Sequence, residues 1–252
     1  MQNLEHHNRR EIEALNQRGG RTLSIVDLIL AGTIGVQIAA HVGAAVGRGG
    51  SFLTAANPGG AGKTALLAAL LGFLPPNLPI VAVDCADVIA SAEPEAGPHC
   101  YLAHEIGPGH WYGYIWGPIV GRYLALADGP HTVASCLHAD THDEVADAIL
   151  ACSILDPPAA LRSIDFILFM HMDAPATSSG YRRRVSAVYQ RQGEDAHRPV
   201  YRWKPEADDF ESLDAPALDD RAQALADLLQ QLTSSNTRDF AAVRRAYLEF
   251  IR

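Results

Sequence analysis

The chain has 252 residues, of which 48% are hydrophobic and 19% charged, and its formal net charge at pH 7 is −9. These values describe a soluble globular protein with an ample core. The acidic balance disfavours a nucleic-acid partner, and no apolar run approaches the ~20 residues needed to cross a bilayer. We therefore expect a cytoplasmic protein without direct membrane insertion, which meets a membrane only through a partner.

The first 50 residues predict helices rather than a complete domain. Residues 1–18 form a polar amphipathic segment, and the stretch 22–50 favours two helices separated by "AGTI", with Ser24 as the N-cap of the first. We divide the chain into a helical N-terminal segment (1–50), a core (51–205) and a C-terminal helical segment (206–252). The last segment should contain helices at about 217–232 and 237–251.

Apolar runs that alternate with helical patterns predict an α/β fold. The predicted strands are Phe52–Ala56, Ile80–Asp84, Tyr101–Glu105, Thr132–His138 and Asp165–His171, with helices at 63–73 and 142–152. This alternation indicates a mostly parallel sheet with helices on both faces. Residues 182–192 should add an antiparallel strand, because their arginines alternate with apolar residues. The following stretch, to about residue 212, is expected to be a connection.

Four cysteines are spread through the chain, at Cys85, Cys100, Cys136 and Cys152. No two of them form a CxxC pair, and each lies in or beside an apolar run. We interpret all four as reduced residues of the core.

The stretch "FLTAANPGGAGKTALLAALL" places a glycine-rich turn between a predicted strand and a predicted helix. Small residues let backbone N–H groups converge on phosphate oxygens, a lysine adds positive charge, and a Ser or Thr hydroxyl reaches Mg²⁺. Asn57 stands where such loops begin with glycine, and we expect it to adopt the left-handed conformation that Asn tolerates. The alternative is an accidental turn. The predicted nucleotide contacts are Asn57, Pro58, Gly59, Gly60, Ala61, Gly62, Lys63 and Thr64.

Polar side chains end three of the other predicted strands. Glu105 and Asp84 can hold a metal-bound water or orient an attacking water, and His138 can contact a terminal phosphate. The alternative is that these are ordinary strand-end residues. A metal site built from protein side chains alone is disfavoured for the two His-containing groups, which are His138, Asp140, His142 and His99, Cys100, His104.

Taken in order, "GGAGKT", "IVAVD", "LAHEI", "ASCLHAD" and "RRRVSAVYQ" resemble the motor domain of the secretion and type IV pilus assembly ATPases, over about residues 24–205. The resemblance implies a RecA-like P-loop fold, ATP and Mg²⁺, a homo-oligomer of hexameric type and a membrane-embedded platform partner. It implies that Thr64 holds Mg²⁺, that Glu105 contacts it through water and that His138 senses the γ-phosphate. Asp84 corresponds to an acidic box.

The chain departs from that family in three respects. At most a remnant of the usual N-terminal domain is present, and an aromatic insertion, "IGPGHWYGYIWGP", follows Glu105. In an alternative register Tyr114 takes the place of the glutamate, but "GPGHWYG" does not fit the buried strand that must precede it. The insertion is expected to lie near the mouth of the site or in a subunit contact. The alternative is a loop folded onto its own domain.

The third departure is that no Lys or Arg occurs between Lys63 and Arg122. An arginine near the γ-phosphate should then come only from a neighbouring subunit, as Arg122, Arg162 or one of 182–184. Three functions remain open: an ATP-hydrolysing motor subunit with slow turnover, a catalytically weak or inactive regulatory or scaffold subunit, and a P-loop kinase or GTPase. The last is disfavoured because no N-K-x-D motif is present.

Overall fold

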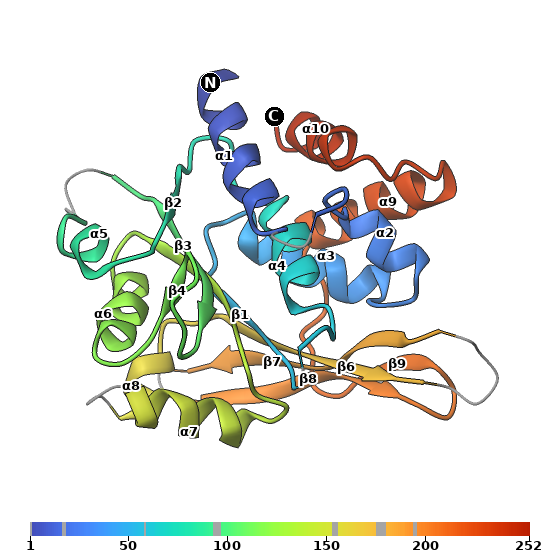
Figure 1. Ribbon diagram of the computed structural model, residues 1–252. Helices are drawn as coiled ribbons and strands as arrows, with labels where there is room; N and C mark the ends of the chain where they lie inside the picture. Colours follow the sequence, from blue (N-terminus) through green and yellow to red (C-terminus); the bar gives the residue numbers. More distant parts are fainter. Residues whose placement is uncertain are drawn as a thin grey trace.

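The protein has an α/β fold, in which one mixed parallel and antiparallel sheet carries helices on both of its faces (Figure 1). The computed structural model describes residues 2–16, 19–57, 59–92, 97–152, 156–174, 180–193 and 196–252. Over this part of the chain the sheet has nine strands, which are β1 (Phe52–Ala55), β2 (Ile80–Ala82), β3 (Cys100–Ile106), β4 (Tyr114–Ile115), β5 (Thr132–Leu137), β6 (Phe166–Asp173), β7 (Arg182–Gln192), β8 (Ala196–Lys204) and β9 (Asp209–Ser212).

The parallel part of the sheet has the strand order β2-β3-β5-β1-β6. These are the five strands predicted from the apolar runs, and that prediction is confirmed. Ala56, Asp84 and His138 lie just beyond the carboxyl ends of their strands. Because β5 lies between β1 and β3, residues at the ends of these three strands meet at one edge of the sheet.

An antiparallel ribbon of β7, β8 and β9 extends the sheet beyond β6. The predicted strand at 182–192 is confirmed, but the expectation that 196–212 is only a connection is wrong. The register of β7 against β8 shifts between Val188 and Tyr189, opposite Pro199. Proline cannot donate to the ladder, and the shift breaks the alternation of side chains. The sequence pattern of β8 is therefore irregular.

The helices form two layers. On one face lie α1 (Gln2–Ala14), α2 (Ile25–Leu30), α3 (Val36–Val46), α4 (Lys63–Leu71), α9 (Asp220–Ser234) and α10 (Phe240–Phe250). On the other lie α5 (Ala86–Ala90), α6 (Ile119–Ala125) with the short 3₁₀ turn η2 (Leu126–Asp128), α7 (His142–Cys152) and α8 (Pro157–Leu161). Right-handed crossovers place α4 on one face and α5, α6, α7 and α8 on the other. The reason is that the chain moves across the sheet in one direction from β1 to β2 and in the opposite direction from β2 through β3 and β5 to β6. No helix of the described residues is long and apolar enough to cross a membrane.

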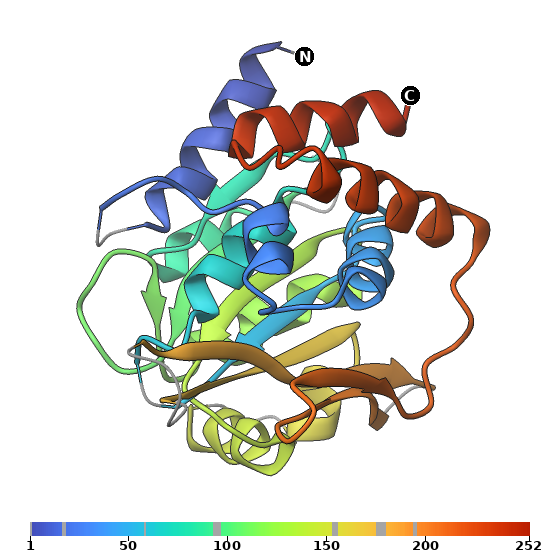
Figure 2. The ribbon, with the colours of Figure 1, turned by 90° about the vertical axis from the view of Figure 1, so that its right-hand side faces the viewer.

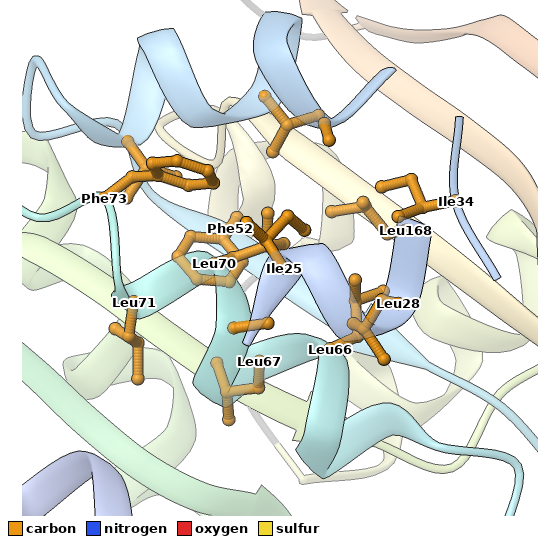
Figure 3. Close-up of a cluster of buried hydrophobic side chains, with 14 of the residues drawn as sticks. Ile25, Leu28, Ile34, Phe52, Leu66, Leu67, Leu70, Leu71, Phe73 and Leu168 are labelled. Carbon is orange, nitrogen blue, oxygen red and sulfur yellow. The ribbon is translucent and has the colours of Figure 1, made fainter. Parts of the chain in front are cut away.

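The larger hydrophobic core surrounds α4, which is apolar on nearly all sides (Figure 3). A helix of that kind has to be covered all round. Phe52 of β1 lies beneath it and Ile25 and Leu28 of α2 lie beside it. This core therefore fixes the position of the amino end of α4 relative to the end of β1.

The predicted helices in residues 22–50 are present as α2 and α3, and Ser24 is the N-cap of α2 as expected. Its hydroxyl accepts from the N–H of Asp27, and the Asp27 carboxylate accepts from the N–H of Ser24, which is a complete capping box. The prediction for the cysteines is wrong at one position. Cys85 is exposed at the N-cap of α5, whereas the other three are buried.

The first and last helices pack on the same core as the helices between them (Figure 2). Asn8 of α1 is 2% exposed, and its side chain donates to the carbonyl of Leu78 at 2.8 Å and accepts from the N–H of Ile80 at 2.9 Å. Arg244 of α10 pairs with Glu5 of α1 and donates to the carbonyl of Gly72. These contacts hold α1 beside the edge strand β2, and they fix where the chain after α1 begins.

We predict that Asn8→Ala lowers the free energy of unfolding by about 1–3 kcal/mol, because it leaves a buried carbonyl and a buried N–H without partners. Urea unfolding followed by circular dichroism measures the change. Asn3→Ala, at an exposed position of the same helix, is the control and should shift the value by less than about 0.5 kcal/mol. Equal effects of the two substitutions would show that the hydrogen bonds of Asn8 do not anchor the helix.

Candidate functional site

The loop between β1 and α4 has the backbone of an anion-binding turn. Gly60 has φ +96° and Gly62 has φ +106°, values that other residues adopt only with strain. Gly62 is the N-cap of α4, and no side chain caps this helix end. The first N–H groups of α4 and the positive end of its dipole therefore face the cavity that Gly62, Lys63 and Thr64 line.

Asn57 does not adopt the left-handed conformation, and that explanation of its presence is wrong. Among the described non-glycine residues, positive φ occurs at Asp208 and Asn236. The N–H of Asn57 instead donates to the carboxylate of Asp140 at 2.6 Å, and its side-chain Oδ1 lies 3.2 Å from Nδ1 of His138. Asn57 thus connects the start of the loop to the segment after β5 through a side chain that glycine lacks.

Lys63 is the buried cation of the site, at 6% exposure. Its Nζ donates to the carbonyl of Ala56 at 3.2 Å, lies 3.2 Å from Nδ1 of His138 and lies 3.6 Å from Oε1 of Glu105. A buried ammonium group is stable only with partners of this kind. The three partners come from the carboxyl ends of β1, β5 and β3.

Glu105 is 5% exposed near the end of β3, where the strand contains an irregularity. The register of β3 against β5 shifts at this point, and the N–H groups of Glu105 and the preceding residue both donate to the carbonyl of Gly113. Such a bulge turns a side chain out of the regular alternation. Oε1 of Glu105 lies 2.8 Å from Nε2 of His138 and 3.6 Å from Nζ of Lys63, but neither contact has the geometry of a hydrogen bond. This buried oxygen therefore keeps room to accept from water.

Tyr114 of β4 lies directly opposite Glu105 in the ladder between β3 and β4. Its hydroxyl donates to Oε2 of Glu105 at 3.5 Å. Glu105 and Tyr114, the two alternatives for the position of the family's glutamate, thus lie side by side. Glu105 is the residue on the long buried strand.

His138 follows β5 and contacts both Lys63 and Glu105. A carboxylate oxygen at 2.8 Å repels a nitrogen lone pair, so Nε2 carries the hydrogen. An ammonium group can only donate, so Nδ1 accepts from Lys63. The tautomer with its hydrogen on Nε2 satisfies both contacts.

These residues line one cavity of about 670 Å³. Trp111 and Tyr114 of the insertion form a further wall, next to His104 of β3. The N-terminal segment forms another wall with Leu15, Asn16, Gly19, Arg21, Thr22 and Leu23. Burial lowers the pKa of His104 and favours its neutral form. The insertion therefore lies at the site, as expected for one of its two predicted placements, and its part in a subunit contact stays a prediction.

The remaining predicted site residues are placed differently. Thr64 and Gly59 line the cavity, and the side chain of Ala61 in the same loop is buried. Asp84 follows β2, is exposed and is not among the residues that line the cavity. Pro58 lies outside the described residues. The proposed contact of Asp84 with nucleotide stays a prediction.

Magnesium fits this site as an ion shared with a ligand. The described residues contain no group of three or more His, Cys, Asp or Glu that could hold a metal ion. Mg²⁺ keeps several waters and commonly needs only one or two protein oxygens together with phosphate oxygens. The hydroxyl of Thr64 and, through water, the carboxylate of Glu105 are oxygens of that kind.

Arg183 contacts the loop of its own chain, and the expectation that an arginine near the γ-phosphate comes from a neighbouring subunit stays a prediction. Its Nε donates to the carbonyl of Gly60 in the same chain at 2.9 Å. The signal was present in the sequence. Because β7 runs antiparallel to β6, its first residues lie at the edge where the parallel strands end. The N-terminal segment also brings Arg21 into the cavity wall, where it pairs with Asp27.

No protein-family model matches this sequence, and no curated protein matches it. Among solved structures, the fold is similar to the crystal structure of the VirB11 ATPase from the Brucella suis type IV secretion system in complex with sulphate. The two chains are 16% identical, and the match covers 59% of this chain and 50% of that one with a TM-score of 0.43. This chain thus spans about half the length of the protein it matches. A likeness of this degree decides neither fold nor function.

We predict that Gly62→Ala lowers the free energy of unfolding by about 1–2 kcal/mol, because alanine is strained at φ +106°. Chemical denaturation measures the change. Gly59→Ala in the same loop is the control, since Gly59 does not have a positive φ and a Cβ there meets nothing within 4 Å. If Gly59→Ala is as destabilising as Gly62→Ala, the left-handed helix start is not what requires glycine.

Proposed function

We propose that the protein is a nucleotide-binding P-loop protein of RecA-like fold that binds ATP together with Mg²⁺ and hydrolyses it slowly. The observation that supports this most is the convergence of Lys63, Glu105 and His138 beside a glycine loop at the amino end of a buried helix. A triphosphate needs converging N–H groups, a cation and a carboxylate that addresses water. An accidental turn would not bring together Lys63 of α4, Glu105 of β3 and His138 after β5.

Each residue has a distinct part in binding. The N–H groups from Gly59 to Thr64 bind phosphate oxygens, and Lys63 neutralises charge on the β- and γ-phosphates. The hydroxyl of Thr64 and, through water, Glu105 hold Mg²⁺, which when bound supplies positive charge to the transferring phosphoryl group. His138 contacts the γ-phosphate through Nε2–H once that group draws Lys63 away from Glu105.

Glu105 is the residue that acts on water. Its Oε1 is buried, and neither His138 nor Lys63 approaches it with hydrogen-bond geometry, so a water molecule in the cavity can donate to it. The Tyr114 hydroxyl at Oε2 limits rotation of the carboxylate. A carboxylate fixed in this way orients an attacking water toward a phosphate held by the loop.

The biological setting follows from the motif order. A chain that resembles the secretion and pilus assembly ATPases is proposed as a motor subunit that forms a homo-oligomer, of hexameric type, and works in the cytoplasm on a membrane-embedded platform protein. Its division into an N-terminal segment (1–50), a core (51–205) and a C-terminal segment (206–252) is part of the same proposal. The exposed Trp111 and Trp116 of the insertion are available for a contact between subunits.

A second candidate is a regulatory or scaffold subunit that binds nucleotide without turning it over. The mutual pairing of Lys63, His138 and Glu105 favours it, because binding must first separate these groups. Both candidates require ATP to bind at the loop. They differ in phosphate release.

We predict that Lys63→Ala weakens ATP binding by about tenfold to a hundredfold or more, because it removes the buried charge that offsets the triphosphate. Isothermal titration calorimetry of the full chain measures the affinity. The chain has one other lysine, Lys204, which is exposed and paired with Glu211, and Lys204→Ala should leave binding unchanged. Unaltered binding by Lys63→Ala would contradict a site at the loop.

We predict that Glu105→Gln reduces steady-state phosphate release by about 10²-fold or more while ATP still binds, because the amide cannot accept the proton of water. A coupled phosphate assay at several protein concentrations measures turnover, which should rise as subunits associate. Glu206→Gln, at an exposed turn, is the control. Wild-type protein that binds ATP but releases no phosphate at any concentration would favour the regulatory candidate.

A further inference from the structure

Three consecutive arginines begin β7, and their partners differ. Arg182 donates to Asp173 at 2.7 and 3.0 Å and lies 3.5 Å from Asp208, while Arg184 donates to Asp208 through two bonds of 2.8 Å. These arginines hold the pKa of Asp208 at about 2, with Arg184 as the main cause. Arg183 has no carboxylate partner among the described residues. Its Nε donates to the carbonyl of Gly60 in the phosphate loop.

The bond to Gly60 fixes the direction of a neighbouring N–H group. A trans peptide is planar, and its C=O and N–H point in opposite directions. Because Arg183 holds the carbonyl of Gly60 on its own side of the loop, the N–H of Ala61 is directed to the other side. No described acceptor takes a hydrogen bond from that N–H.

The loop needs such a restraint because its glycines are permissive. Gly60 and Gly62, on either side of Ala61, both have positive φ, and glycine loses more conformational freedom on ordering than any other residue. The stem of Arg183 also lies against Gly62, where an added Cβ would be 3.4 Å from its Cδ. One side chain therefore restrains both glycines.

The charge of Arg183 is also available to the loop. Lys63 lies 3.6 Å from Glu105, so its charge is partly offset before any ligand binds. The charge of Arg183 is not offset by any described carboxylate within 4 Å. Only Nε bonds to Gly60, and Arg183 as a whole is exposed.

We propose that Arg183 is a positioning residue of the phosphate loop that acts within its own chain. From across the loop it turns the N–H of Ala61 toward the bound phosphates, and it adds to the loop one positive charge that no described carboxylate offsets. This inference rests on the proposed function, since it concerns the same anion site. It assigns to β7 a part in the phosphate loop of its own subunit.

The test is Arg183→Met, which keeps an apolar stem against Gly62 and removes the guanidinium. Affinities for ATP, pyrophosphate and adenosine are measured by calorimetry, and the amide signals of residues 59–64 by nitrogen-15 NMR. Arg198→Met is the matched control, because Arg198 is exposed on the adjacent strand β8, paired in register with Gln190, about seven residues or ~23 Å along the sheet from Arg183.

We expect Arg183→Met to weaken ATP and pyrophosphate binding by about tenfold or more, to leave adenosine binding unchanged and to shift the Ala61 amide signal in the free protein. Arg198→Met should do none of these. If the wild type binds ATP and Arg183→Met binds it equally well, the role of Arg183 is overturned while the proposed function stands. Equal weakening for adenosine, or an unshifted Ala61 amide, also overturns it. If the wild type binds neither ATP nor pyrophosphate, the proposed function itself fails, and the role of Arg183 fails with it.

Discussion

Burying the ammonium group of Lys63 is possible only because three parallel strands end around it. The free-energy cost of removing a charge from water is large, and it is offset here by the carbonyl of Ala56, the carboxylate of Glu105 and the imidazole of His138. These partners belong to β1, β3 and β5, whose order in the sheet places β5 between the other two. The site is therefore a consequence of the topology, and the packing of α4 on the core keeps Lys63 at its centre.

Much of this could be predicted from the sequence, because parallel strands buried on both faces appear as continuous apolar runs. The strand ends then placed Glu105 and His138 at one edge. Two features were missed because they depend on contacts between distant segments. The strands β8 and β9 pair across a register shift at Pro199, which removes the regular alternation that would have indicated them. The conformation of Asn57 follows from its bond to Asp140, 83 residues away.

The N-terminal segment, treated as a remnant in the sequence, forms part of the cavity. Asn8 attaches α1 to the edge of β2 through two buried hydrogen bonds. The cavity lining that follows α1 is formed by Leu15, Asn16, Gly19, Arg21, Thr22 and Leu23. Apolar residues of this segment and small residues of α4 face the same space. Because the N-terminal segment forms this wall of the cavity, no separate domain is needed to form it. The pairing of Arg21 with Asp27, which also caps α2, holds the wall in place.

The ligand-free contacts also imply an order of events at the site. Lys63 attracts Glu105 and donates to His138, so all three groups are engaged with one another before a ligand arrives. An anion at the loop competes for Lys63, because a phosphate carries more charge than the single carboxylate it displaces. In the proposed function, Lys63 and the Nε2–H of His138 then turn to the phosphate, and Glu105 keeps Tyr114 as its neighbour. Oε1 of Glu105 would thus become open to a water only when there is a phosphate for that water to attack.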